Sequence, residues 1–344
     1  MAIRKEHLHF ACRELQTNAV VSRHAASLPR NDINNRPMIG ILSQPGEPAP
    51  KGMSYIAASY IKWVESAGAR AVPILYDMSE QEIKRRFSLV NGILLPGGGA
   101  NLSPGHPFYD TARLLVDLAV EANENGDYFP VHGTCLGMET LAVILSGNYS
   151  ILTSFDAENS PVPLLFTDEA ESSHLIQSLP EVVVRDLQNS PITMENHMMG
   201  LSMASYQAER KLKDFFSVLS LSIDNSGNPY ISTIEARKYP ITATQWHPEK
   251  NAFEWHEELD IPHSPSAVRM SQAIANFFVS EARRNMHKAR NAIEEDDVLI
   301  YNWKPFFTGK NTGHGGEERD FAQCYFFDGE VTATPDDTEG TSAL

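Results

Sequence analysis

Short apolar runs alternate with stretches of helical period from residue 38 onward. Four of the runs are strand-like: MIGIL at 38–42, AVPIL at 71–75, GILLP at 92–96 and FPVH at 129–132. Helical patterns lie between and after them, at 55–68, 79–87, 111–126 and 136–147. This alternation is typical of parallel strands joined by helices. It predicts a three-layer α/β fold with a mostly parallel sheet flanked by helices.

The rest of the chain has a less regular pattern. Prolines interrupt the apolar pieces after residue 150, but two strand-like runs at 215–224 and 228–236 flank an Asn-Ser-Gly turn and predict a hairpin. Residues 265–285 have the spacing of an amphipathic helix. We therefore predict a loosely structured leader at 1–36, one domain at 37–328, and an acidic, disordered tail at 329–344.

The formal charge of −16 over 344 residues limits the partners of the chain. It argues against nucleic acid, which needs clustered Lys and Arg. No run of about 18 apolar residues occurs, so membrane insertion is not expected. The first residues lack a sustained apolar core, which favours a cytosolic protein or an atypical secretory start. Because the whole molecule would repel a polyanion at long range, a polyanion site is expected to be locally basic.

The three cysteines, Cys12, Cys135 and Cys324, show no CxxC and no metal-ligand spacing, so a disulfide framework or zinc site is not indicated. Cys135 lies in GTCLG at 133–137, between an apolar strand and a helix. That context is typical of a nucleophile elbow, in which flanking glycines permit a strained turn. The helix that begins at Leu136 would favour the thiolate. The alternative, a buried filler cysteine, does not account for both glycines.

A thiol nucleophile needs a base and a group that orients the base. His247 and Glu249 lie in QWHPE after a strand-like run, and residues two apart in extended chain project to the same side. Glu249 can therefore hold the His247 ring while the other ring nitrogen faces Cys135. An exposed His-Pro-Glu turn is the alternative interpretation.

The glycine run after the strand GILL is the candidate oxyanion loop. Its bare backbone allows a substrate to approach closely, and it opens at the carboxyl edge of a parallel sheet, where the elbow also lies. The predicted donors are the backbone N–H groups of Gly98 and Leu136. A phosphate-binding loop is disfavoured because GGGANLSPG has no Lys-Ser/Thr pair.

The motifs PGGG, GTCLG and QWHPEK, in this order, resemble the class I glutamine amidotransferase-like superfamily, which has a flavodoxin-like fold. The blocks RPMIGIL, KGMSYIAASYIKWVESAGARAVPI, HGTCLGMETL, QWHPEKNAFEW and LIYNWKPFFTG resemble γ-glutamyl hydrolases across residues 37–328. The resemblance implies thiol-dependent hydrolysis of γ-glutamyl bonds in folyl- or antifolyl-poly-γ-glutamates. It implies a Cys-His-Glu triad, a thioester intermediate, no metal or redox cofactor, a small-molecule substrate and a homodimer.

Three substrate-binding residues are carried over from the resemblance. Glu139 lies one helical turn after Cys135 and would grip a glutamyl α-amino group, against the alternative of a helix-surface acid. His197 corresponds to a histidine near the substrate, although NHMMG departs from the aromatic surroundings of the family. Tyr55 corresponds to a tyrosine near the pocket, against the alternative of a core aromatic.

Lys250 is a fourth substrate-binding candidate, chosen because it directly follows the predicted triad residue Glu249. Its ammonium would contact the α-carboxylates of the substrate. The alternative is a solvated lysine, which is the usual state of that residue type.

The chain also departs from the family. His132 stands where many relatives have Trp and adds a titratable ring behind the elbow. The family works in vacuoles, lysosomes or outside the cell, whereas the start of this chain shows no signal and leaves the cytoplasm as the alternative. Glycosylation sequons begin at Asn101 and Asn148, and they matter only in the secretory path.

Two other functions fit the same motifs. One is a glutaminase subunit that releases ammonia from glutamine, and it would need a separate synthetase partner because the chain has no ATP-binding glycine-lysine motif. The other is a catalytically silent binding protein on the same fold. The presence of all three triad residues argues against the silent protein.

Overall fold

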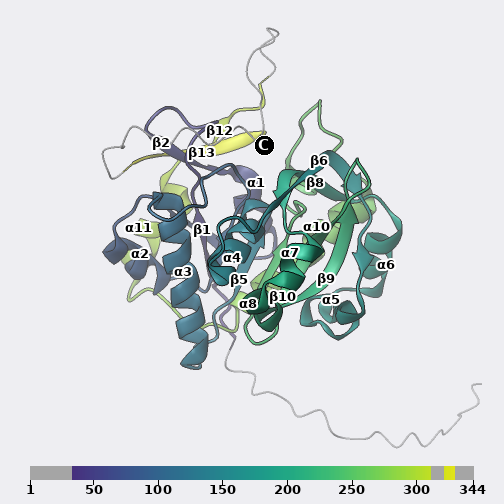
Figure 1. Ribbon diagram of the computed structural model, residues 1–344. Coiled ribbons are helices and arrows are strands. Elements are labelled where there is room, and N and C mark those ends of the chain that lie inside the picture. The colour runs from purple at the N-terminus through teal and green to yellow at the C-terminus, as the bar shows by residue number, and fades with distance from the viewer. Residues whose placement is uncertain (1–32, 311–320, 330–344) are drawn as a thin grey trace, which may run out of the picture. The chain divides into compact units, whose positions relative to one another are not determined.

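An eight-stranded sheet forms the centre of the computed structural model, which describes residues 33–310 and 321–329 (Figure 1). Five strands are parallel, in the order β3 (Arg70–Ile74), β1 (Met38–Leu42), β4 (Gly92–Leu95), β5 (Val131–Thr134) and β11 (Ile241–Thr244). The sheet continues with antiparallel strands β10 (Pro229–Ala236), β9 (Phe216–Ile223) and β7 (Leu165–Phe166). The predicted mostly parallel sheet is confirmed, and so is the predicted hairpin, as β9 and β10.

The helices surround this sheet. Those that pack near the site are α1 (Ala58–Ser66), α4 (Leu136–Ser146), α9 (Lys250–Phe253) and α10 (Pro265–Ala282). The others are α2 (Glu80–Phe87), α3 (Pro107–Glu124), α5 (His174–Ser178), α6 (Glu181–Asn189), α7 (Met203–Ala208), α8 (Arg210–Phe215) and α11 (Ala292–Val298), with 3₁₀ turns η1 (Asp168–Ser172) and η2 (Ile300–Asn302). None of the described helices is long and apolar enough to cross a membrane.

Strand β5 shows that helices cover both faces of the sheet. A Cβ built on Gly133 would lie 3.0 Å from the Leu141 side chain of α4. The preceding residue, His132, points to the other face, where its ring lies 5.6 Å from the rings of Trp63 in α1 and Phe278 in α10. The predicted three layers are therefore α4 on one face, the sheet, and α1 with α10 on the other.

Two smaller sheets flank the carboxyl ends of the parallel strands. One contains β2 (Met53–Ala57), β13 (Gln323–Asp328) and β12 (Phe306–Phe307), and the other pairs β6 (Thr153–Val162) with β8 (Thr193–Gly200) (Figure 1). Gln44, two residues after β1, anchors the first small sheet at this edge, because the backbones of Gln44 and Tyr55 exchange hydrogen bonds. The Met194 carbonyl of β8 anchors the second small sheet at this edge, because it accepts the His247 N–H at 2.9 Å.

The prediction of a helix from residue 55 was wrong at its start. Residues 53–57 form β2, and the helix begins at Ala58. The apolar positions of this segment suit either structure, and the pairing of β2 with β13 decides between them. That partner comes from the far end of the chain, so the local pattern does not reveal it.

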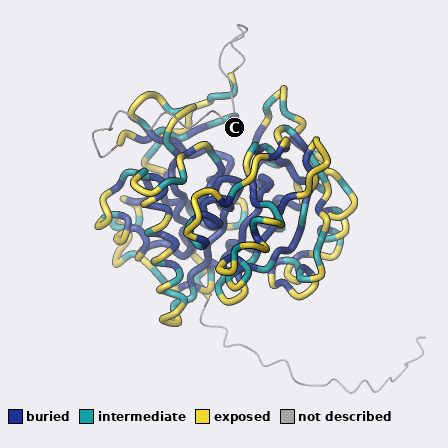
Figure 2. Tube along the Cα trace, in the orientation of Figure 1, coloured by how far each residue is buried: buried dark blue, intermediate teal, exposed yellow. Residues whose placement is uncertain are grey.

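The strands of the parallel sheet are buried along almost their whole length, while the exposed residues lie in the loops and on the outer helix faces (Figure 2). The predicted leader lies mostly outside the described residues, but its end is already bound to the domain. Asn34 donates its N–H to the Arg283 carbonyl at 2.8 Å, and Arg36 pairs with Glu295. The predicted tail also lies almost entirely outside the described residues.

Candidate active site

Cys135 occupies a strained turn between β5 and α4. Its φ of 52° and ψ of −112° are unfavourable for a residue with a side chain, at a cost of about 1–3 kcal/mol. Gly137 makes the turn possible, because a Cβ there would lie 2.0 Å from the Leu95 carbonyl oxygen. The Cys135 N–H donates to the Thr244 carbonyl at 2.8 Å, which anchors the turn to β11. The strained strand-to-helix turn predicted from GTCLG is thus present.

The candidate base and its partner lie directly after β11. His247 Nδ1 is 2.8 Å from Glu249 Oε1, and both side chains are buried. His247 Nε2 forms no hydrogen bond with any other described residue, so it is available to a thiol. A Cβ built on Gly97 would lie 2.8 Å from His247 Cε1 and 3.3 Å from Cys135 Cβ, so the two side chains flank the same glycine.

The electrostatics of this group differ from the expected thiolate. Burial, followed by the charge of Glu139, raises the pKa of the Cys135 thiol, and the Lys250 ammonium and the Leu136 N–H oppose that rise without cancelling it. Burial also lowers the pKa of His247, although Glu249 acts in the opposite direction. Both groups are therefore neutral at rest near pH 7. For the thiol, the effect of burial on the pKa is larger than the opposite effect of the helix N-terminus.

The glycine loop presents the N–H of Gly98 beside this pair. Gly97 donates its N–H to the Tyr60 hydroxyl at 2.8 Å, so that group is already used. The Gly98 N–H forms no hydrogen bond with another described residue, and its φ of 154° together with a built Cβ 2.5 Å from Gln44 Cδ requires glycine. The Leu136 N–H has no partner within α4 because it is a first-turn group, and it hydrogen-bonds the Cys135 thiol. Sequence reasoning missed Tyr60, which only the folded chain brings under the loop.

Lys250 is buried, with 3% of its surface exposed, which contradicts the alternative of a solvated lysine. Its ammonium lies 5.6 Å from the centre of the Phe321 ring and has no ion pair within the described ranges. Phe321 in turn packs against Tyr55, with ring centres 5.8 Å apart. The site is not locally basic as expected, because buried carboxylates, Glu249 and Glu254, surround this lysine.

A second buried group lies around Glu139, whose side chain accepts a hydrogen bond from Gln245 Nε2 at 2.9 Å. Burial raises the pKa of Glu139 to about 7, and the charge of His197 limits the rise. His197 itself has both ring nitrogens taken, by the Met199 carbonyl at 2.8 Å and by Glu195 at 3.2 Å. It therefore has no N–H left for a direct contact with substrate. Sequence reasoning missed Glu195, although its spacing of two from His197 in a strand was a usable signal.

Comparison with known proteins decides the family. The peptidase C26 family model matches residues 37–249. The chain belongs to this family. The mouse gamma-glutamyl hydrolase is 42% identical over 310 residues, which are 90% of this chain and 95% of the mouse protein. Gamma-glutamyl hydrolase B of Dictyostelium discoideum is 40% identical over 89% of this chain and 87% of its own length. The human gamma-glutamyl hydrolase is 39% identical over 88% of this chain and 93% of the human protein.

These similarities confirm two predictions made from the motifs. The chain is similar to γ-glutamyl hydrolases, and it is a cysteine-type hydrolase of the peptidase C26 family.

His132, which departs from the family, does not add a titration near neutral pH. Burial lowers its pKa to about 4, and its Nδ1 lies 2.9 Å from the Thr242 hydroxyl.

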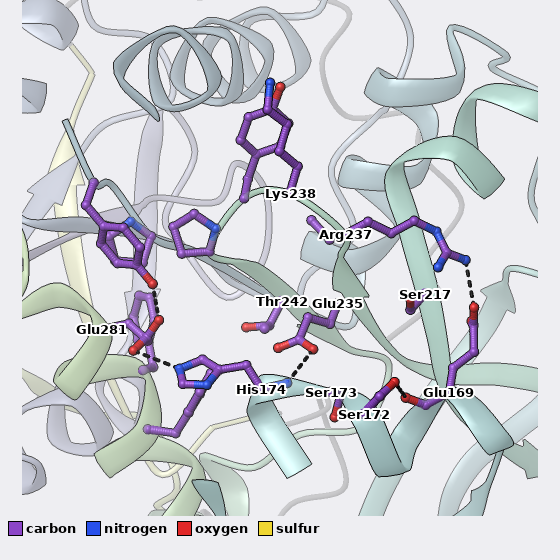
Figure 3. A pocket seen from close by; sticks show the side chains of 17 residues that line it. Glu169, Ser172, Ser173, His174, Ser217, Glu235, Arg237, Lys238, Thr242 and Glu281 are labelled. Atoms are coloured by element: carbon purple, nitrogen blue, oxygen red, sulfur yellow. Dashed lines mark hydrogen bonds and ion pairs between the residues drawn. The ribbon is translucent and has the colours of Figure 1, made fainter. Parts of the chain in front are cut away.

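A separate cavity of about 430 Å³ lies at the opposite, amino edge of this peptidase's sheet, next to Pro130 and Thr242 (Figure 3). Its carboxylates are occupied by the protein itself: Glu235 accepts the N–H of His174 at 2.9 Å, and Glu281 lies 3.2 Å from His174 Nε2. No predicted site residue lines it. Among residues 33–310 and 321–329, no cluster of His, Cys, Asp and Glu is arranged to hold a metal ion.

Proposed function

We propose that this peptidase hydrolyses γ-glutamyl amide bonds, most specifically those of folyl- or antifolyl-poly-γ-glutamates. The observation that carries the proposal is the strained Cys135 beside the buried His247–Glu249 pair. The curated relatives named above, which match along nearly their whole length, are gamma-glutamyl hydrolases. The substrate class and the residue roles proposed for this chain rest on these side chains and these relatives together.

In the proposed reaction, the Cys135 sulfur attacks the γ-carbonyl carbon while His247 Nε2 takes the thiol proton. Proton removal by His247 is needed because the buried thiol is neutral at rest. Glu249 stabilises the imidazolium that forms. The carbonyl oxygen becomes an oxyanion and accepts the N–H groups of Gly98 and Leu136, each worth roughly 3 kcal/mol in the transition state.

Collapse of the tetrahedral intermediate breaks the C–N bond and leaves a thioester on Cys135. His247 gives its proton to the nitrogen of the departing glutamate. Water then attacks the thioester carbon, with His247 as the base again, and releases the γ-carboxylate and the free thiol. Every proton in this scheme passes through His247.

The substrate class is tested by comparing two releases from the wild-type protein. Glutamate release from a γ-linked glutamyl dipeptide is expected to have a larger kcat/KM than ammonia release from glutamine. Mass spectrometry of products from a defined pentaglutamate would then locate the cleaved bond. Faster ammonia release would overturn the proposal and favour the glutaminase, and no release from either substrate would favour the silent binding protein.

Lys250 is proposed to contact the α-carboxylates of the substrate, because its buried ammonium has no ion pair with another described residue. We expect Lys250→Met, which keeps the packing on Phe321, to raise KM for a pentaglutamate by about tenfold with kcat little changed. For the dipeptide the rise is expected to be about twofold or less. Steady-state kinetics on the two substrates measures both.

Lys84→Met is the matched control for this prediction. Lys84 is exposed on α2 and pairs with Glu80, so its loss should leave both KM values unchanged. If the KM values for the pentaglutamate and the dipeptide were the same in Lys250→Met as in the wild type, the buried lysine would have a structural role alone.

A further inference from the structure

Two buried side chains of β8 form an ion pair that the reaction scheme does not use. Glu195 and His197 lie two residues apart in the strand, so both project to the same side. They are 0% and 3% exposed, which removes water as a partner for either. Neither side chain forms a hydrogen bond with the described residues of the Cys135 turn, so a role in the chemistry would have to be indirect.

The hydrogen-bond partners determine how many protons His197 carries. Its Nδ1 lies 2.8 Å from the Met199 carbonyl, which only accepts, so this nitrogen must hold a proton. Its Nε2 lies 3.2 Å from Glu195 Oε2, while Oε1 of the same carboxylate accepts the Ser232 hydroxyl at 2.9 Å. Because imidazole is a stronger base than a carboxylate, the shared proton belongs on Nε2. His197 is then an imidazolium.

The charge of His197 affects the substrate site through Glu139. The backbone N–H of Gln245 donates to the Ser232 carbonyl at 2.8 Å, and the Gln245 side chain donates to Glu139. Ser232 thus joins the Glu195 group to the Glu139 group. The titratable groups that face His197 are Glu195 from β8, Glu139 from α4 and Tyr230 from β10, whose ring centre is 4.8 Å away.

We propose that Glu195 is a positioning residue that holds His197 as an imidazolium, and that this cation increases the ionised fraction of Glu139 in the substrate site. The proposal rests on the proposed function for its consequence in substrate binding. The direction of the pKa values agrees with the geometry. Burial, the largest influence, lowers the pKa of His197, but Glu195 and Glu139 together raise it above its usual value. For Glu139, burial raises the pKa to about 7, and the His197 charge is the largest opposing influence.

The protonation state is tested first, in the intact protein and without any substrate. Nitrogen-15 NMR of histidine-labelled wild type at pH 8 should show His197 with both nitrogens protonated, and the signal is identified by its loss in His197→Gln. In Glu195→Gln the ring should be neutral at pH 8. A neutral His197 in the wild type would overturn the proposal, and so would an unchanged charged ring in Glu195→Gln.

Substrate binding is tested with two γ-glutamyl dipeptides that differ only in the α-amine, one free and one acetylated. Loss of the His197 charge should raise the pKa of Glu139 further, which lowers its ionised fraction at pH 7. Glu195→Gln should therefore raise KM about fivefold for the free ammonium substrate and much less for the acetylated one, with kcat nearly unchanged.

Ser232→Ala is the matched control, because it removes the hydrogen bond to Glu195 but keeps the charge of the carboxylate. It should leave the KM ratio of the two dipeptides at the wild-type value. A general packing defect would change both variants alike and would overturn the proposal. Failure of the wild type to cleave either dipeptide would instead count against the proposed function, and the NMR result would stand on its own.

Discussion

Cys135→Ala is expected to lower kcat by about 10⁴-fold or more while the protein still binds substrate. The alanine removes the attacking sulfur, and removal of the nucleophile alone eliminates most of the catalysis of a triad. Little volume is lost, and the Gly98 and Leu136 N–H groups stay in place, so binding should persist. Single-turnover product analysis measures the first expectation, and titration calorimetry with a γ-glutamyl dipeptide measures the second.

Two further variants make this result specific. Cys324→Ser alters a buried cysteine on β13, a strand outside the central sheet, and should leave kcat near the wild-type value. Cys135→Gly should be as inactive as Cys135→Ala but more stable by about 1–2 kcal/mol, because glycine relieves the strain at φ 52°. Turnover near the wild-type rate in Cys135→Ala would exclude the thiol mechanism.

Much of the central sheet could be predicted because its signals are local. Strands β1 and β4 are short apolar runs bounded by turns, and their burial on both faces favours such continuously hydrophobic runs. The start of α1 could not be predicted, because the choice between strand and helix at residues 53–57 depends on pairing with β13. That prediction failed because β2 and β13 are far apart in the sequence, and not because the residues have a weak strand propensity.

The candidate site divides in the same way. Cys135, His247 and Glu249 could be found because each lies in a short motif whose spacing carries the geometry. Tyr60 has no neighbouring motif that indicates its contact with the glycine loop, and only the fold brings it there. Glu195 could have been found from its spacing of two from His197 in a strand. The thiol pKa was expected to fall because the helix N-terminus is visible in the sequence, whereas the burial that raises it is a property of the whole fold.

Gly137 is the position where a single methyl group should damage the fold most. It is the second residue of α4, where replacement of glycine by alanine ordinarily stabilises a helix by about 0.5–1 kcal/mol. Here the built Cβ lies 2.0 Å from the Leu95 carbonyl oxygen and 2.8 Å from its carbonyl carbon. Both atoms belong to the backbone of β4 in the middle of the sheet, so they cannot move aside as a flexible side chain would.

We therefore expect Gly137→Ala to lower the free energy of unfolding by about 3 kcal/mol, because the overlap with β4 outweighs the gain in helix propensity. The separation of α4 from β4 that relieves the overlap would also displace Cys135, so kcat should fall in the fraction that remains folded. Denaturant unfolding followed by circular dichroism measures the stability. Gly99→Ala is the control, since a Cβ there meets no atom within 4 Å and its loss of glycine should cost little. If Gly137→Ala were as stable as the wild type, α4 could not approach β4 as closely as described, and the strained turn at Cys135 would lose its structural basis.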